Sequence, residues 1–165
     1  MNACDLSREQ TMRISAIGVD LIPLSRLSRV LKRSPRLFHA LCHELEEPHR
    51  CSSSGEGLVW AAALWTAKEA AVKCIGTGFW RRGVEWNEIR VSPLLYPLHE
   101  LQSKRNFLMK PQDLKISLHG KAAAVAGKVS MKGTFELIPP EIHAHENPST
   151  NFDSLIALSH MALYR

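Results

Sequence analysis

The 165-residue sequence contains no apolar run that approaches the roughly 18 residues needed to cross a lipid bilayer. Its N-terminus also lacks the charged and then apolar pattern of a secretory signal peptide. We therefore expect a cytoplasmic protein with no membrane partner. No internal repeat and no low-complexity tract is present.

Cysteine is scarce, and its spacing is uninformative. The sequence has four cysteines, Cys4, Cys42, Cys51 and Cys74, and no two of them form a Cys-x-x-Cys pair. Zinc sites and disulfide frameworks are usually recognised by such close spacings, so neither is indicated. Reduced and partly buried thiols are the expected state.

Acidic residues are fewer than basic ones, which gives a formal net charge of +5. An excess of Lys and Arg favours an anionic partner, such as a nucleotide, an acidic protein or a nucleic acid. No recognised nucleic-acid motif accompanies the charge, so we expect no nucleic-acid partner. With 45% hydrophobic and 22% charged residues, the composition is that of a single globular domain over residues 1–165, of which 1–11 are polar and expected to fray.

The strongest helix signal lies between Trp60 and Lys73, a stretch with six alanines and no glycine or proline. Gly76 is placed to end this helix. Glu69 and Lys73 lie one turn apart on the same side, together with the bulky Trp65. On spacing alone, an ordinary i,i+4 ion pair is the simplest interpretation.

A second, amphipathic helix is expected to begin near Pro23. Its apolar residues recur at helical spacing, and its arginines fall on a different stripe. The apolar residues are Leu24, Leu27, Val30 and Leu31, and the arginines are Arg26, Arg29 and Arg33. This cationic stripe is either a docking surface for an acidic partner or an ordinary solvated face.

The rest of the sequence alternates short strands and helices with loops between them. We expect strands at 12–19, 88–92, 114–118 and 155–164, helices at 36–47 and 121–131, and loops or linkers at 48–57, 76–83, 93–111 and 136–152. The glycines of the loop at 76–83 follow a helix, which argues against a dinucleotide fingerprint. Its two arginines, Arg81 and Arg82, suit either a phosphate contact or a solvent-exposed connection.

Several motifs, taken in order, resemble the signature of the 4′-phosphopantetheinyl transferases of the holo-acyl-carrier-protein synthase type. The two central ones are Gly18-Val19-Asp20 and the helical run Trp65-Thr66-Ala67-Lys68-Glu69-Ala70-Ala71-Val72-Lys73. The others are Gly76-Thr77-Gly78, Arg82-Gly83-Val84 followed by Trp86, Lys110-Pro111, Leu118-His119-Gly120-Lys121-Ala122 and Leu158-Ser159-His160. The resemblance covers about residues 14–160.

This resemblance implies an α+β fold, a small antiparallel sheet packed with helices, assembled as a homotrimer. It implies Mg²⁺-dependent transfer of the 4′-phosphopantetheine arm of coenzyme A to a serine of an apo acyl-carrier protein. Such a reaction breaks a pyrophosphate bond and needs the charge on the phosphate oxygens to be neutralised. A magnesium ion held by one or two carboxylates and by substrate oxygens is a physical solution.

The resemblance also implies roles for individual residues. Asp20 and Glu69 would hold the metal, and Lys73 would bind the coenzyme A phosphates, which makes these three the catalytic candidates. Further candidates for contact with coenzyme A are Lys68, His160, Lys110 and Pro111, and the candidates for docking the acidic carrier are Arg26, Arg29 and Arg33.

The sequence departs from the family pattern in places. Met109-Lys110-Pro111 stands where the family has Gly-Lys-Pro, and Ala157-Leu158-Ser159-His160 stands where it has Ser-x-Ser-His. An alternative is therefore a diverged, non-catalytic relative that binds an acidic protein through its basic face. The presence of both carboxylates and of Lys73 favours the enzyme.

Overall fold

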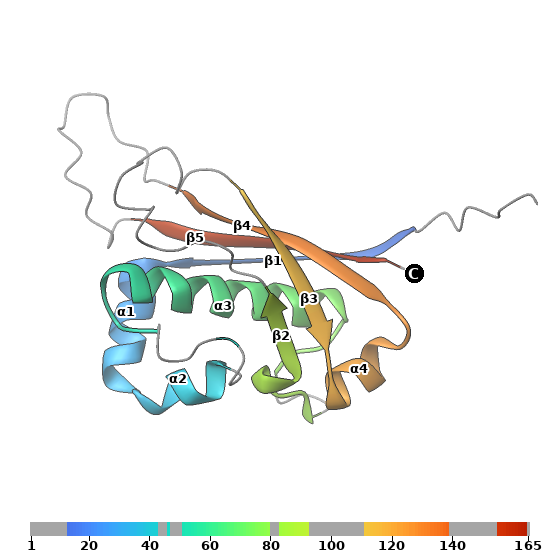
Figure 1. Ribbon diagram of the computed structural model, residues 1–165, viewed down its shortest axis with the longest axis horizontal. Coiled ribbons are helices and arrows are strands. Elements are labelled where there is room, and N and C mark those ends of the chain that lie inside the picture. Colours follow the sequence, from blue (N-terminus) through green and yellow to red (C-terminus); the bar gives the residue numbers. More distant parts are fainter. Residues whose placement is uncertain are drawn as a thin grey trace, which may run out of the picture.

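The computed structural model describes residues 13–42, 46, 51–79, 83–92, 111–138 and 155–164. Five antiparallel strands form one sheet in the order β1-β5-β4-β3-β2 (Figure 1). The strands are β1 (Ile14–Pro23), β2 (Ile89–Ser92), β3 (Gln112–Leu118), β4 (Ser130–Ile138) and β5 (Ile156–Tyr164). The helices are α1 (Leu24–Arg33), α2 (Arg36–Leu41), α3 (Gly55–Cys74), the short 3₁₀ helix η4 (Trp86–Glu88) and α4 (Gly120–Ala126). The expected α+β fold is confirmed.

The core is built on α3, which packs along β1 and β5 (Figure 1). All its residues from 58 to 64 are buried, and a helix that is apolar on every side belongs inside a domain. The helix begins at Gly55, so the expectation of a loop through Gly57 is wrong. Burial of Leu58 and Val59 outweighs the low helix propensity of the two glycines.

The end of α3 is where the sequence predicted it. Gly76 has a φ of 76°, in the left-handed region that glycine adopts without strain. Its N–H donates to the Lys73 carbonyl at 3.1 Å, and the Thr77 N–H donates to the Val72 carbonyl at 3.2 Å. This pair of bonds is the Schellman motif, which satisfies carbonyl groups that a helix end leaves unpaired. The cap therefore fixes the last turn of α3 beside β1.

β1 crosses α3 very closely at Gly18. A Cβ atom at this position would collide with the carbonyl oxygen of Ala70 and would lie 2.9 Å from the Cys74 nitrogen. Only glycine permits such a close approach of two backbones. The crossing brings the next residues of β1 alongside α3.

The second half of the sheet differs from the sequence-based expectation. The helix predicted over 121–131 ends instead at Gly127, which has a φ of 75°. The chain then forms β4, in which Met131, Phe135 and Leu137 face the core with the two-residue period of a strand. The change from helical to strand period is hard to recognise, because it directly follows an alanine-rich stretch. The expectation of a linker from residue 136 is also wrong, since β4 continues to Ile138.

The other elements agree better with prediction. β2, β3 and β5 match the expected strands, and β1 continues through to Pro23, which serves as the N-cap of α1. α2 is shorter than the predicted helix, because Cys42 already has extended backbone angles. The rest of that predicted helix lies outside the described residues, except for Glu46.

The helices cover one face of the sheet, and the outer face of β1, β5 and β4 is bare in the part of the chain that the structure describes (Figure 1). β1 is an edge strand with four exposed apolar side chains, Ile14, Ile17, Val19 and Leu21. Ile17 is 68% exposed. A large apolar patch on an edge strand marks a surface that another chain can cover.

No helix within the described ranges is both long and apolar enough to cross a membrane.

Candidate active site

Asp20 and Lys73 meet where β1 passes the last turns of α3. Asp20 lies opposite Ser159 of β5, and the Ser159 hydroxyl is 2.8 Å from the Thr66 hydroxyl of α3, so both strand residues face the helix. The Lys73 ammonium group donates to Asp20 Oδ1 at 2.6 Å and to the Val19 carbonyl at 3.0 Å. The lysine side chain is 50% exposed, which leaves its ammonium group accessible to a ligand.

Glu69 lies one turn before Lys73 on the same side of α3. Burial raises the pKa of the Glu69 carboxyl, the negative charge of Asp20 raises it further, and Lys73 lowers it. Because the charge of Asp20 acts on Glu69, the two carboxylates lie within electrostatic range of each other. The hydrogen bonds of Lys73 are made with β1, not with Glu69. Asp20, Glu69 and Lys73 therefore form a three-residue cluster across β1 and α3, in place of the simple ion pair that the spacing suggested.

The donor set suits a hard divalent cation. Two neighbouring carboxylates repel each other, and a bound cation removes that repulsion. Within the described residues no group of three or more His, Cys, Asp or Glu side chains could enclose a metal ion. Mg²⁺ is usually bound by only one or two carboxylates, together with substrate phosphates and water. The residues therefore fit the magnesium ion that the family resemblance implies.

Lys68 has a different environment from the one that the sequence suggested. Its side chain is fully buried, and its ammonium group donates to Glu46 Oε2 at 2.6 Å, to the Leu41 carbonyl at 2.6 Å and to the Trp86 carbonyl at 3.1 Å. Burial lowers the pKa of Lys68, and Glu46 opposes that shift. Glu46 Oε1 in turn accepts from the Val91 N–H at 2.8 Å. All three N–H groups are used inside the protein, so Lys68 is not available to coenzyme A in this structure.

Aromatic side chains stand beside the cluster. Trp65, one turn before Glu69, packs edge-on against Trp86 with ring centres 4.7 Å apart. Phe79 also packs edge-on against Trp86, with ring centres 5.2 Å apart. Helical spacing places Trp65 on the same side as Glu69, but it does not predict the contact with the other two rings, because both follow α3 in the chain and are not part of it.

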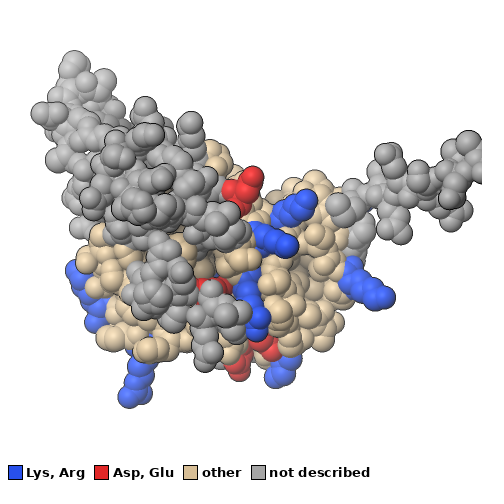
Figure 2. Space-filling view, viewed as in Figure 1, with Lys and Arg blue, Asp and Glu red and all other residues tan. Residues whose placement is uncertain are grey.

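The basic stripe of α1 has the predicted arrangement. Arg26, Arg29 and Arg33 are exposed, whereas Leu24, Leu27 and Leu31 are buried. The Arg29 Nε–H donates to the Ser25 carbonyl one turn earlier at 3.3 Å. Figure 2 shows basic side chains projecting along the edge formed by α1. These guanidinium groups face solvent and can pair with acidic groups of another molecule.

His160 lies on the other face of the sheet from Asp20. Its neighbour Ser159 points toward α3, so the His160 side chain points away, and it is 48% exposed. The imidazole Nε2 is 3.8 Å from Glu136 Oε1. Within one chain, His160 therefore does not join the Asp20 cluster. Pro111 is exposed just before β3, and Lys110 lies outside the described residues.

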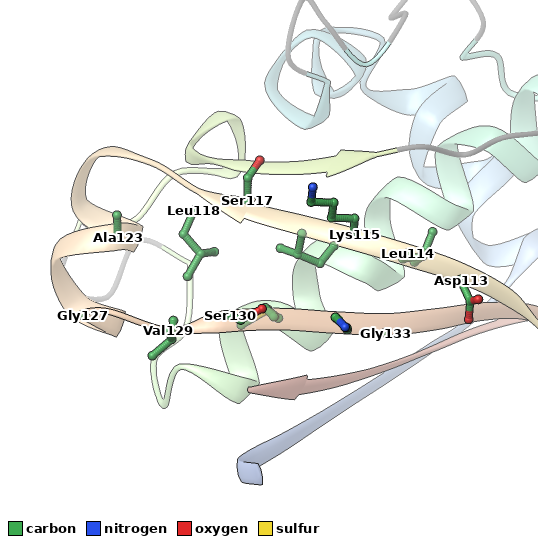
Figure 3. Close-up of a pocket in the computed structure, with 13 residues that line it drawn as sticks. Asp113, Leu114, Lys115, Ser117, Leu118, Ala123, Gly127, Val129, Ser130 and Gly133 are labelled. Atoms are coloured by element: carbon green, nitrogen blue, oxygen red, sulfur yellow. The ribbon is translucent and has the colours of Figure 1, made fainter. Parts of the chain in front are cut away.

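A hollow of about 680 Å³ lies between β3, β4 and α4 (Figure 3). Lys115 and Lys132 line it and are directly opposite each other in the β3–β4 register. Like charges in this position repel, and an anion between them would reduce the repulsion. The sequence alone does not reveal this hollow, because it does not predict β4, the strand that carries Lys132.

Residues 16–126 match the model of the 4′-phosphopantetheinyl transferase superfamily, and the chain belongs to that superfamily. The holo-[acyl-carrier-protein] synthase of Alkaliphilus metalliredigens is 36% identical over 78 residues, which are 47% of this chain and 62% of that protein. The Herpetosiphon aurantiacus protein of the same name is 34% identical over 126 residues, which are 69% of this chain and 96% of that protein. The match to the first thus spans less than two thirds of that relative.

A solved structure, the ACPS–CoA complex of Chronobacterium ammoniagenes, has a TM-score of 0.56 to this chain. The comparison covers 91% of this chain and 96% of that one at 21% sequence identity. At this identity the likeness shows the fold alone, and it confirms the α+β architecture.

Proposed function

We propose that the protein transfers the 4′-phosphopantetheine arm of coenzyme A to a serine of an apo acyl-carrier protein. The observation that carries this proposal is the cluster of Asp20, Glu69 and Lys73 at the crossing of β1 and α3. The names of the relatives support the reaction, and the coenzyme A bound in the Chronobacterium structure supports the co-substrate. In this reaction the serine oxygen forms a bond to the β-phosphorus, and 3′,5′-ADP leaves.

Asp20 and Glu69 would hold Mg²⁺, which supplies neutralising charge at the pyrophosphate when it is bound. Lys73 contributes the next positive charge. Its accessible ammonium group is placed to turn from Asp20 toward a phosphate oxygen, since a bound cation would neutralise that carboxylate in its stead. Trp65 and its neighbouring rings form an apolar boundary beside Glu69.

We place the carrier on α1. Carrier proteins of this kind are expected to present acidic side chains, and Arg26, Arg29 and Arg33 offer the complementary charge. The buried leucines on the opposite side of α1 fix the helix to the core, so the arginines keep a constant orientation.

We further propose that the chain forms a homotrimer through the bare face of the sheet. Ile17 and Leu21 are 68% and 60% exposed, which is unfavourable for a lone chain in water. Light scattering should give three times the monomer mass. Ile17→Asp should reduce the mass to that of one chain, and an unchanged mass would place the interface elsewhere.

The transfer itself is tested by incubating the protein with coenzyme A, Mg²⁺ and a panel of apo carrier proteins, followed by mass spectrometry of the carriers. The proposal expects one carrier to gain a phosphopantetheine group only when coenzyme A and Mg²⁺ are both present. If no carrier gains mass but an apo carrier still binds the protein, the chain is a non-catalytic binding module.

A further inference from the structure

The fold brings two cysteines together outside the active-site cluster. Cys42 is buried at the C-terminal end of α2, and Cys51 is partly exposed shortly before α3. Their sulfur atoms lie 3.1 Å apart, with one thiol hydrogen-bonded to the other. Because a disulfide bond is about 2.05 Å long, an approach of about 1 Å would join them.

The surroundings of this pair favour ionisation. The hydrogen bond from Cys51 lowers the pKa of Cys42, and the positive charge of Lys68 lowers it further against the effect of burial. The pKa of Cys51 is raised, chiefly because its thiol is hydrogen-bonded to Cys42. Once the pair of thiols has lost one proton, the two sulfur atoms therefore share the proton that remains. Thiolates are the species that attack disulfides, so the pair is prepared for exchange.

Cys74 provides a contrast within the same molecule. It is buried, its thiol donates to the Ala16 carbonyl at 3.3 Å, and burial raises its pKa. Backbone hydrogen bonds of Gly18 and Leu163 lower the pKa of Cys74, but the effect of burial is larger, so the thiol form is favoured. The paired cysteines are thus chemically distinct from an ordinary buried cysteine of this chain.

We propose that Cys42 and Cys51 form a thiol–disulfide site for small disulfides such as glutathione disulfide, and that its closure weakens carrier docking on α1. In the first step the Cys42 thiolate accepts the proton of the accessible Cys51 thiol as Cys51 Sγ attacks one sulfur of the small disulfide, forms a mixed disulfide and releases one small thiolate. The released thiolate takes that proton from Cys42, and in the second step the Cys42 thiolate attacks Cys51 Sγ and displaces the other small thiolate, which takes a proton from water. The protein loses two electrons and two protons, and one small disulfide becomes two small thiols.

A hydrogen bond connects this site to α1. The buried Ser28 of α1 donates its hydroxyl to the Ser53 carbonyl at 2.7 Å, and Ser53 is two residues after Cys51. Since Ser53 is only two residues from Cys51, movement of Cys51 toward Cys42 is expected to displace the Ser53 carbonyl and weaken this bond. The effect on docking rests on the proposed function, because it assumes that the arginines of α1 bind the carrier.

The chemical half of the proposal is tested without any enzyme activity. The full-length protein is equilibrated in glutathione buffers of increasing oxidising strength, trapped with maleimide after acid quenching, and weighed. The oxidised protein should take up two fewer maleimide groups than the reduced protein, and proteolysis should yield a peptide that links Cys42 to Cys51. Cys4→Ser should retain this behaviour, whereas Cys51→Ser should lose it. A loss of thiols without the linked peptide would overturn the assignment.

The coupling to α1 is tested by carrier kinetics in the two redox states. Oxidation should raise the KM for the carrier roughly threefold, the effect of one weakened hydrogen bond, and leave the KM for coenzyme A unchanged. Ser28→Ala should give the same carrier KM in both states. Equal KM values for the oxidised and reduced native protein would refute the coupling. Failure of the proposed function would appear separately, as a reduced enzyme that transfers nothing.

Discussion

Replacement of the buried lysine, Lys68→Met, is the most decisive test of how α3 is held in place. The substitution keeps the volume of an unbranched side chain and removes the ammonium group. Glu46 then loses its ion partner in the interior, and the carbonyl groups of Leu41 and Trp86 lose their donor. Lys68 contacts α2, η4 and Glu46, and Glu46 in turn accepts from the Val91 N–H of β2. One substitution therefore weakens the connection of α3 to three other elements.

The expected loss of stability is large. Removal of one partner of a buried ion pair typically costs about 3–5 kcal/mol, because the remaining charge is left without compensation. At about 2–4 °C per kcal/mol for a chain of this size, the midpoint of thermal unfolding should fall by about 6–20 °C. The double variant Lys68→Met with Glu46→Gln buries no charge and keeps an acceptor for the Val91 N–H. It should lose only about 1–3 kcal/mol, from the carbonyl groups that stay unpaired.

Urea titration and thermal unfolding followed by circular dichroism measure these changes, and coenzyme A affinity is measured at low temperature where both variants are folded. The structure predicts lost stability with coenzyme A affinity close to that of the native protein. A variant that unfolds like the native protein but binds coenzyme A weakly would refute the structural role and restore the ligand contact suggested by the sequence.

Three further substitutions test the other parts of the site and of the fold. Lys73→Ala should weaken coenzyme A binding in calorimetry and leave carrier binding unchanged, because its ammonium group is accessible beside the carboxylates; unchanged affinity for coenzyme A would return Lys73 to a structural role. Arg26→Glu combined with Arg29→Glu should raise the carrier KM severalfold at low salt and less at high salt, since exposed charge pairs are screened; identical kinetics at low salt would place docking elsewhere. Gly18→Ala should destabilise the fold by more than about 1 kcal/mol, because its Cβ collides with α3 backbone that cannot move freely; native stability would show that β1 can shift.

The sequence predicted the parts of the site that depend on local periodicity. The helical spacing of Glu69 and Lys73, the two stripes of α1 and the glycine that ends α3 follow from rules that act over a few residues. The family resemblance supplied the link between Asp20 and α3, which are about fifty residues apart. The crossing at Gly18 then explains physically why that link forms.

Long-range contacts were the part that the sequence did not reveal. Lys68 is followed directly by a metal-binding candidate, yet its side chain points into the core, because a helix turns by 100° at each residue. The partners that satisfy it, Glu46 and two backbone carbonyls, lie in other elements. β4 was missed for a similar reason: its strand period begins only a few residues after an alanine-rich helix, and pairing with β3 and β5 stabilises it.

We propose that Asp20 and Glu69 together hold the metal on which transfer depends. The most direct measurement is the rate of phosphopantetheine transfer to an apo carrier as a function of Mg²⁺ concentration, for the native protein, Asp20→Ala and Glu69→Ala. The structure predicts that each variant loses transfer while its circular dichroism spectrum stays native, because one carboxylate alone leaves the pyrophosphate charge poorly neutralised. Near-native transfer by either variant at low millimolar Mg²⁺ would contradict the assignment.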